Sequence, residues 1–267
     1  MLRDITLGQY YPGKSCIHRL DARIKIIATL MFIVELFIVD NFIGFLVAAI
    51  ALGVVIAVSK VPVGYIIRGL KPIMVILIFT FALNMFMVDG RILLWQWGFL
   101  KITAEGLEIA VFMAIRLILL LMGSSMLTLC TRPIALTDGI ERLLSPFEKV
   151  GLPAHDIAMM MTIALRFIPT LLEEADKIMK AQQARGADFE SGNLMQRAKS
   201  LIPILVPLFV SSFRIAQELA MAMEARCYRG GKNRTRMNEM KLRKRDYIAI
   251  VFLIAFLAII IVESRLI

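Results

Sequence analysis

Five long apolar runs dominate the sequence and decide which solvent the chain can fold in. They cover residues 24–39, 42–58, 72–88, 107–130 and 247–262, and each comes close to the ~20 residues that a helix needs to cross a bilayer. Hydrophobic residues make up 59% of the 267 residues, and the mean hydropathy is +0.76, far above that of a soluble domain. A single segment in lipid satisfies its backbone groups only as a helix. We therefore expect an all-α integral membrane protein with about five transmembrane helices.

The positive charges predict how these helices are oriented. The formal net charge is +10, and the basic residues gather in particular loops, as positive-inside topology requires, so they do not indicate nucleic-acid binding. The turn Asp40-Asn41 after the first run carries no positive charge. The basic loops contain Arg3, Lys14, Arg19, Arg23 and Lys25 before the first run, Lys60, Arg68 and Lys71 after the second, and the strongly basic segment 229–245 before the last. With five spans, the N-terminus is then cytoplasmic and the C-terminus lies outside.

The segment 131–228 has a different character, because it contains two long amphipathic helical patterns that end alike. Apolar residues recur three and four positions apart along both patterns, as on one face of a helix. The first ends in Ala184, Arg185 and Gly186, and the second ends in Ala225, Arg226 and Cys227. A single Arg followed by a small residue is also an ordinary helix C-terminus. Two copies on neighbouring helices make these six residues the candidate functional site.

Two placements of these helices follow from the sequence. As two further spans they would put a connecting segment outside, against the positive-inside bias, and this segment contains Lys177, Lys180, Arg185, Arg197 and Lys199. We expect instead long helices along the cytoplasmic face, bent by Pro169, Pro203 and Pro207. The chain then divides into residues 1–130 with four spans, 131–228 with the cytoplasmic helices, and 229–267 with a basic linker and the last span.

Chemically reactive groups are few. Glu35 and Arg116 lie within spans, where an ionised side chain needs a partner or water. They could pair between the first and fourth spans, or each could reach the interface separately. His18 and His155 are far apart in sequence, and we expect His18 to be a structural hydrogen-bonding residue. The sequence contains no phosphate-binding glycine loop or metal-ligand cluster, so we expect no cofactor, no metal site and no catalytic activity.

A family resemblance rests on specific parts of this text. The N-terminal stretch GQYYPGKSCIHRLDARIKI and the helix ends AQQARGADF and MEARCYRGGKNRTR resemble the transmembrane T component of energy-coupling factor (ECF) transporters. The resemblance covers nearly the whole chain. Its most specific parts are the paired Ala-Arg-small motifs and the His-x-Leu-Asp-x-Arg-x-Lys signature, formed here by His18, Leu20, Asp21, Arg23 and Lys25.

The resemblance implies a function and a set of partners. In that family the cytoplasmic coupling helices cross, their Ala-Arg-Gly ends dock on two ATPase subunits of the ABC type, and another face holds a substrate-binding S component. Arg185 and Arg226 would then be the ATPase contacts, with Cys227 standing where Gly is commonest. This implies a non-catalytic subunit of an ATP-driven importer for vitamins or transition-metal ions, in a prokaryotic cell membrane.

Two other classes of protein are alternatives to this prediction, a secondary transporter and a membrane enzyme. A self-contained secondary transporter needs polar residues that converge at the middle of the bilayer, and the spans offer only Glu35, Arg116 and Asn84. A membrane enzyme needs a nucleophile, a metal or an acid/base cluster, and none is evident in the sequence. The secondary transporter is therefore the main alternative.

Overall fold

The computed structural model describes residues 10–88, 92–97, 100–189, 193–230 and 242–266. These residues form two compact units. The first unit contains the described parts of 8–139 and 239–267, and the second contains the described parts of 140–238.

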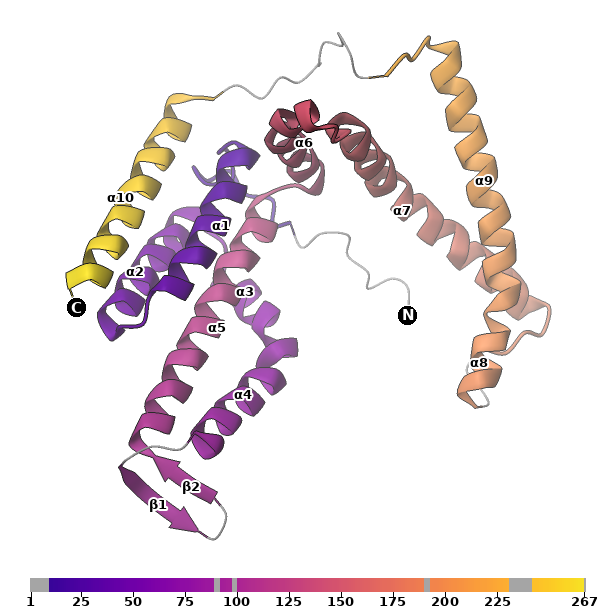
Figure 1. Ribbon diagram of the computed structural model, residues 1–267. Helices are drawn as coiled ribbons and strands as arrows, with labels where there is room; N and C mark the ends of the chain where they lie inside the picture. The colour runs from indigo at the N-terminus through magenta and orange to yellow at the C-terminus, as the bar shows by residue number, and fades with distance from the viewer. Residues whose placement is uncertain (1–9, 89–91, 98–99, 190–192, 231–241, 267) are drawn as a thin grey trace. The chain divides into compact units, whose positions relative to one another are not determined.

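The first unit is a helical bundle around one long central helix. That helix is α5 (Ala104–Cys130), which packs against α1 (Ala22–Ile38), α2 (Phe42–Ser59), α3 (Val63–Leu70) and α4 (Met74–Met87) (Figure 1). The 3-10 helix η2 (Lys71–Ile73) joins α3 to α4, and α10 (Lys244–Leu266) packs against α1 and α2. The five apolar runs of the sequence are thus helical, as predicted.

The core of this unit lies between α1, α2 and α5. Leu36, Phe45, Leu52 and Met126 are buried there, and their burial removes apolar surface from the surrounding solvent. At Gly123 the helices come so close that an added β-carbon would lie 2.6 Å from the Phe32 ring. The small residue therefore permits the close packing of α5 on α1.

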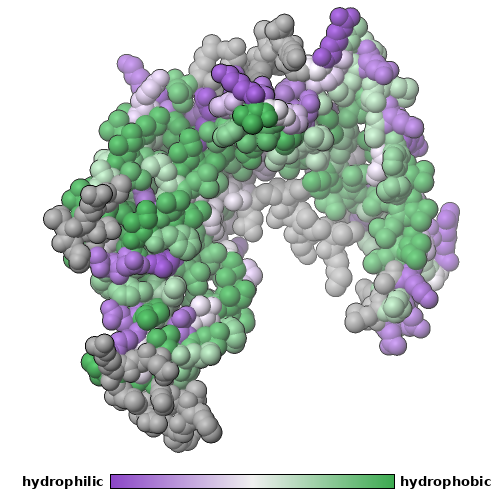
Figure 2. Space-filling model, viewed as in Figure 1, coloured by the Kyte–Doolittle hydropathy of each residue, from purple (hydrophilic) through white to green (hydrophobic). Residues whose placement is uncertain are grey.

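Much of the outer surface of the first unit is apolar too. The helix α4 contains no buried residue, although it consists almost entirely of hydrophobic side chains. Figure 2 shows hydrophobic residues spread across the visible surface of this unit. An apolar surface of this extent is suited to lipid and not to water.

A two-stranded hairpin connects α4 to α5, where the sequence suggested only a loop. Strands β1 (Leu93–Trp97) and β2 (Leu100–Thr103) pair antiparallel, with Trp97 opposite Leu100. Trp, Ile and Thr, all present in these strands, favour the extended backbone. Thr103 then caps α5, because its hydroxyl accepts from the N–H of Gly106 at 3.1 Å.

The second unit contains the two amphipathic patterns. Helix α6 (Pro133–Leu144) begins in the first unit and ends in the second, and η3 (Ser145–Val150) follows it. The long helix α7 (Ala154–Ala184) continues through Pro169. The second pattern is not one helix, as the sequence suggested, but is divided into α8 (Leu194–Ser200) and α9 (Ile202–Ala225). The division falls at Leu201, just before Pro203, because proline cannot donate the hydrogen bond that a continuous helix would need there.

Among the residues that the structure describes, five helical stretches are long and apolar enough to cross a membrane. They are α2, the continuous stretch Val63–Met87, α5, α7 and α9, with mean hydropathies of 2.7, 2.0, 2.1, 1.3 and 1.4 respectively. The helical, membrane-embedded fold class is thereby confirmed. By length and composition α7 and α9 also qualify as spans, with the lowest hydropathies of the five stretches. The cytoplasmic placement of α7 and α9 therefore stays a prediction.

Glu35 and Arg116 do not pair with each other. The Arg116 guanidinium donates to the backbone carbonyl of Val39 at 2.8 Å and to Asp40 Oδ1 at 3.0 Å. Asp40 is 84% exposed, so Arg116 reaches the polar end of α1, where a charged group is less costly than in the bundle. Glu35 is 2% exposed, and its Oε1 has no hydrogen-bond partner among the described residues. The pairing considered from the sequence is therefore wrong.

Candidate functional site

The two Ala-Arg-small motifs have the same backbone structure. Arg185 follows the last residue of α7 with φ −86° and ψ 4°, and Arg226 follows that of α9 with φ −90° and ψ 11°. The next residues are left-handed, with φ of 88° at Gly186 and 54° at Cys227. Both ends therefore adopt the left-handed helix cap that usually requires glycine.

Matching hydrogen bonds close the two caps. The N–H of Gly186 donates to Gln183 at 2.9 Å, and the N–H of Ala187 donates to Gln182 at 3.0 Å. At the end of α9 the equivalent bonds run from Cys227 to Glu224 at 2.8 Å and from Tyr228 to Met223 at 3.0 Å. This is the Schellman pattern, in which the last helical carbonyls are satisfied by the chain that turns away. The repeat seen in the sequence is thus a repeat in structure.

All six residues of the two motifs, Ala184–Gly186 and Ala225–Cys227, are exposed. Within the described part of the chain, the guanidinium groups of Arg185 and Arg226 have no hydrogen-bond or ion-pair partner. Each motif thus presents small side chains and one planar cation with five donors, which suits bidentate binding of a carboxylate.

The motifs lie at opposite ends of an antiparallel pair of helices. Gln182 near the end of α7 donates to the carbonyl of Pro203 at the start of α9 at 3.4 Å. Tyr228, just after α9, lies against the start of α7, with its hydroxyl 3.0 Å from the sulfur of Met159. Figure 1 shows the two helices running in opposite directions. From His155 to Arg185 the helix rises roughly 45 Å at 1.5 Å per residue, so the motifs are too far apart to form one site.

His155 and Tyr228 anchor the second motif, which the sequence did not indicate. The Nε2 of His155 lies 3.3 Å from the Tyr228 hydroxyl, and its Nδ1 donates to Glu141 at 3.0 Å. Tyr228 directly follows the left-handed Cys227, the position at which a Schellman cap commonly makes a hydrophobic contact. That position was the one available signal, but its partners come from α6 and α7 and are not evident from local sequence.

The His-x-Leu-Asp-x-Arg-x-Lys signature forms an internal brace in the first unit. His18 Nε2 donates to the carbonyl of Tyr11 at 3.0 Å, so its Nδ1 accepts from Ser15 at 2.6 Å. The Lys25 ammonium donates to the carbonyls of His18 at 3.2 Å and Cys130 at 2.9 Å. The structural role predicted for His18 is confirmed.

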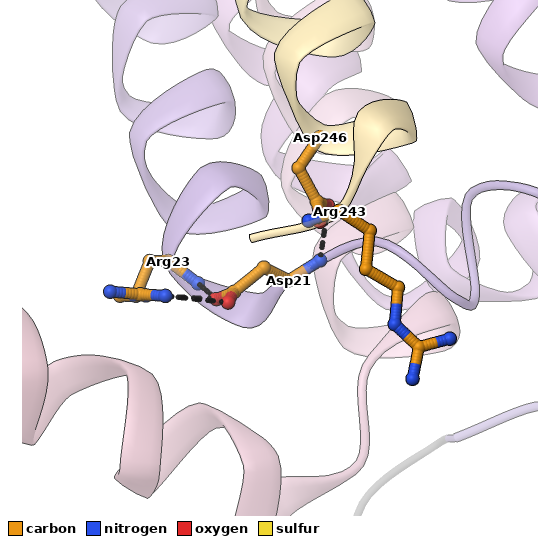
Figure 3. A network of polar contacts seen from close by, with 4 residues as sticks. All are labelled: Asp21, Arg23, Arg243 and Asp246. Carbon is orange, nitrogen blue, oxygen red and sulfur yellow. Dashed lines mark hydrogen bonds and ion pairs between the residues drawn. The ribbon is translucent and has the colours of Figure 1, made fainter. Parts of the chain in front are cut away.

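Asp21 connects α1 to α10 in the same brace (Figure 3). Its carboxylate accepts from the N–H of Arg23 at 2.9 Å and from the guanidinium of that residue at 2.8 Å. Its own N–H donates to Asp246 Oδ1 at 3.0 Å, while Asp246 Oδ2 accepts from the N–H of Arg243 at 2.7 Å. The Asp21 carboxylate caps α1, and the Asp246 carboxylate joins the start of α10 to the start of α1.

The brace changes the acidity of two groups. Burial lowers the pKa of His18, outweighing the carbonyl of Tyr11, which acts to raise it. Burial acts to raise the pKa of Asp21, but the hydrogen bonds and positive charge of Arg23 outweigh it, so the pKa of Asp21 lies below its ordinary value. The brace thus favours a neutral imidazole and an ionised carboxylate near neutral pH.

Comparison with known proteins decides the family. Residues 13–237 match the family described as "Cobalt transport protein". The chain belongs to this family. A member from Clostridium kluyveri, named energy-coupling factor transporter transmembrane protein EcfT, is 61% identical over 250 residues, covering 93% of both chains. Proteins with the same name from Thermosediminibacter oceani and Bacillus subtilis are 58% and 44% identical, covering 94% and 97% of this chain and 94% and 98% of their own.

These relatives confirm the resemblance that the sequence motifs indicated. The present chain matches three proteins named as transmembrane components of energy-coupling factor transporters over more than nine tenths of its length. The chain is therefore a membrane protein that functions in transport. Within the described residues, no group of three or more His, Cys, Asp or Glu side chains is arranged to hold a metal ion.

Proposed function

We propose that this chain is the non-catalytic, energy-coupling subunit of an ATP-driven ECF importer for vitamins or transition-metal ions. It links two cytoplasmic ATPase subunits to a substrate-binding S component in a prokaryotic cell membrane. The observation that carries the proposal is the pair of caps at Arg185 and Arg226, which share one backbone geometry and are both exposed. Two caps of the same geometry, at opposite ends of one helix pair, are suited to two similar partners.

The chemistry of each cap supports docking on a protein groove. A left-handed turn after a helix of small terminal residues lets a partner approach the backbone closely, since only Ala, Gly and Cys side chains flank the arginine. The guanidinium can then bind carboxylates or helix-end carbonyls of the partner with two parallel hydrogen bonds. An arginine that becomes buried on docking is typical of the residues that dominate small interfaces.

The antiparallel packing of α7 and α9 supports transmission of movement. Because each motif is at the far end of a helix packed on the other, displacement of either end shifts a shared interface. When the ATPase pair closes on ATP and opens after hydrolysis, the caps follow their partners, and the helix pair moves the bound S component. Substrate recognition then belongs to the S component and the hydrolysis to the ATPases.

The alternative of a self-contained secondary transporter has less support. Its three candidate residues each have separate surroundings: Asn84 donates to the carbonyl of Thr80 in its own helix at 2.9 Å, and Arg116 binds Asp40. Glu35 is buried, and its Oε1 has no hydrogen-bond partner among the described residues. A convergent midplane site would bring these groups together.

Replacement of the two arginines tests the proposal. Arg185→Ala and Arg226→Ala should each weaken ATPase docking by ~2 kcal/mol or more, which is roughly 30-fold in affinity, and the double variant should lose uptake altogether. Lysine should substitute poorly, because it keeps the charge and lacks the planar fork. The measurements are vitamin uptake in proteoliposomes and co-purification of the ATPase subunits.

A control on the same helix makes this test specific. Arg214 is also exposed on α9 but lies within the helix and not at its cap, so Arg214→Ala should leave ATPase co-purification unchanged. Membrane insertion should be equal in all variants. Normal uptake and co-purification by the double arginine variant would reduce the two motifs to simple helix caps and remove the main support for the proposal.

A further inference from the structure

Two neighbouring cavities in the first unit have complementary chemistry. One is basic, with a volume of about 480 Å³, and the other is apolar, with a volume of about 430 Å³. Both volumes are in the range of ligand pockets, roughly 300–1,000 Å³. Leu20, Lys25 and Cys130 line both of them, so the cavities adjoin at the cytoplasmic end predicted for α1 and α5.

The basic cavity has the chemistry of an anion site. Arg19, Lys25, Arg132 and Arg243 line it, against the carboxylates of Asp21 and Asp246. Both carboxylates already accept hydrogen bonds, Asp21 from Arg23 and Asp246 from the backbone N–H groups of Asp21 and Arg243. The cations therefore exceed the acidic groups, and those groups are occupied within the brace.

Several donors in the basic cavity remain available. The side chain of Arg243 extends away from both carboxylates (Figure 3), and the ammonium of Lys25 uses two of its three donors on carbonyls. Thr131 is 3% exposed and lines the cavity, and its hydroxyl has no hydrogen-bond partner among the described residues. A buried polar group without a partner is costly, and a ligand oxygen would satisfy it.

The apolar cavity continues from the basic one along α1. Its walls come from α1, α2, α5 and α10, and Lys25 and Glu35 mark positions ten residues apart on α1. That separation is roughly 15 Å along a helix, which is half of the ~30 Å hydrocarbon core of a bilayer. The wall residues Val54, Val58, Ile248 and Phe252 are also exposed on the outer surface, so the cavity opens where lipid chains would surround the protein.

We propose that the paired cavities bind one anionic glycerophospholipid from the leaflet next to the basic loops. The phosphate lies among Arg132, Arg243, Lys25 and the Thr131 hydroxyl, and one acyl chain fills the apolar cavity beside α1 and α10. Phosphate oxygens match arginine and hydroxyl donors, and that leaflet is rich in anionic lipids. A free phosphate would occupy the basic cavity alone, and the apolar cavity favours the lipid.

Native mass spectrometry of the purified full chain tests this site, with phosphatidylglycerol or phosphatidylcholine added in equal amounts. We expect phosphatidylglycerol to remain bound to the wild-type chain and to bind at least about tenfold more weakly to the double variant Arg132→Gln, Arg243→Gln, because each loses charged hydrogen bonds. Arg68→Gln is the matched control. The guanidinium carbon of Arg68 lies 5.5 Å from the centre of the Tyr65 ring, much as that of Arg132 lies 5.6 Å from the centre of the Tyr10 ring. Arg68 is exposed, but it lies outside both cavities.

A second pair of variants tests the acyl chain. Ala28→Phe and Ala249→Phe fill the apolar cavity from α1 and from α10, and either should reduce the binding of both lipids. Inorganic phosphate at millimolar concentration should not displace the lipid. The proposal is overturned if phosphate displaces it, if the double arginine variant binds as well as Arg68→Gln, or if the filled variants bind as well as the wild type. Should the filled variants not fold, thermal denaturation of the wild type decides: equal stabilisation by both lipids overturns the proposal.

Discussion

At the end of α9, Cys227 has a β-carbon in the left-handed backbone region that glycine normally occupies. Its φ of 54° corresponds to 88° at Gly186 in the other cap. An L-residue with a β-carbon is less stable there by roughly 1–2 kcal/mol, and the Schellman bonds from Cys227 and Tyr228 hold it in place. The cap geometry is thus independent of glycine, although its stability is not.

Substitutions at Cys227 and Gly186 test whether the left-handed backbone limits the stability of the caps. Cys227→Gly should raise the free energy of unfolding by up to about 1 kcal/mol, and Gly186→Ala should lower it by a similar amount. The space around the Gly186 β-carbon position is empty within 4 Å, so any loss there reflects backbone conformation and not a clash. Thermal denaturation in detergent measures both changes. Cys227→Ala separates the thiol from the backbone: a stability equal to that of Cys227→Gly would contradict the argument.

At the scale of whole elements, the N-terminal segment holds the ends of three helices together. Tyr11 donates its N–H to the carbonyl of Leu129 at 2.9 Å, and Lys25 satisfies the carbonyl of Cys130, both at the end of α5. Asp21 caps α1, and its backbone N–H donates to the carboxylate of Asp246 at the start of α10. The signature residues therefore act mainly within the chain, and the brace also forms one wall of the basic cavity.

The charge of Asp21 gives this brace a dependence on pH. The folded-state pKa of Asp21 is below its ordinary value of 3.8, so its contribution is present above that pH and is lost as pH falls through the folded pKa. Asp21→Asn should therefore destabilise the protein by about 1 kcal/mol at pH 7, and the difference from wild type should shrink below pH 3.8. Denaturation at pH 7, 5 and 3 measures it. An equal difference at all three values would show that the charge is not involved.

At the scale of the whole molecule, we predict that the second unit lies on the cytoplasmic side of the membrane. Helices α7 and α9 are long and apolar enough to cross, but charged residues interrupt their outer faces, including Glu173, Lys177 and Lys180 on α7. The positive-inside bias favours a cytoplasmic position for both helices and for the chain between them. That position is also required if Arg185 and Arg226 are to meet ATPases.

Cysteine labelling tests this topology. A cysteine at Asn41, between α1 and α2, should react with an impermeant thiol reagent from outside, and one at the exposed Asn193, before α8, should not. The exposed Cys16 and Cys227 are replaced with serine first, since they would otherwise react in permeabilised cells. Reaction at Asn193 after permeabilisation confirms its accessibility. Reaction there in intact cells would favour seven spans and would contradict the coupling proposal.

The local chemistry of the chain was sufficient for most of the helices and for the motifs. Long apolar runs have one stable backbone form in lipid, so α1, α2, α4, α5 and α10 were predictable within a few residues. The two caps were recognisable because Arg and a small residue end a helix by local bonds alone. The break at Leu201 and the hairpin at β1 and β2 were missed, since each depends on weak local preferences that compete with a helical or irregular alternative.

Contacts between distant segments were decided only by the tertiary structure. The sequence could not exclude an ion pair between Glu35 and Arg116, because both are charges in apolar helices, whereas the packing of α5 on α1 puts the guanidinium beside Asp40. It also did not show that α9 ends against the start of α7, which separates the two caps, or that Thr131 faces a basic cavity next to an apolar one. Composition and periodicity determine which faces are buried, but partners are selected by side-chain packing between segments far apart in the chain, and no local pattern encodes that choice.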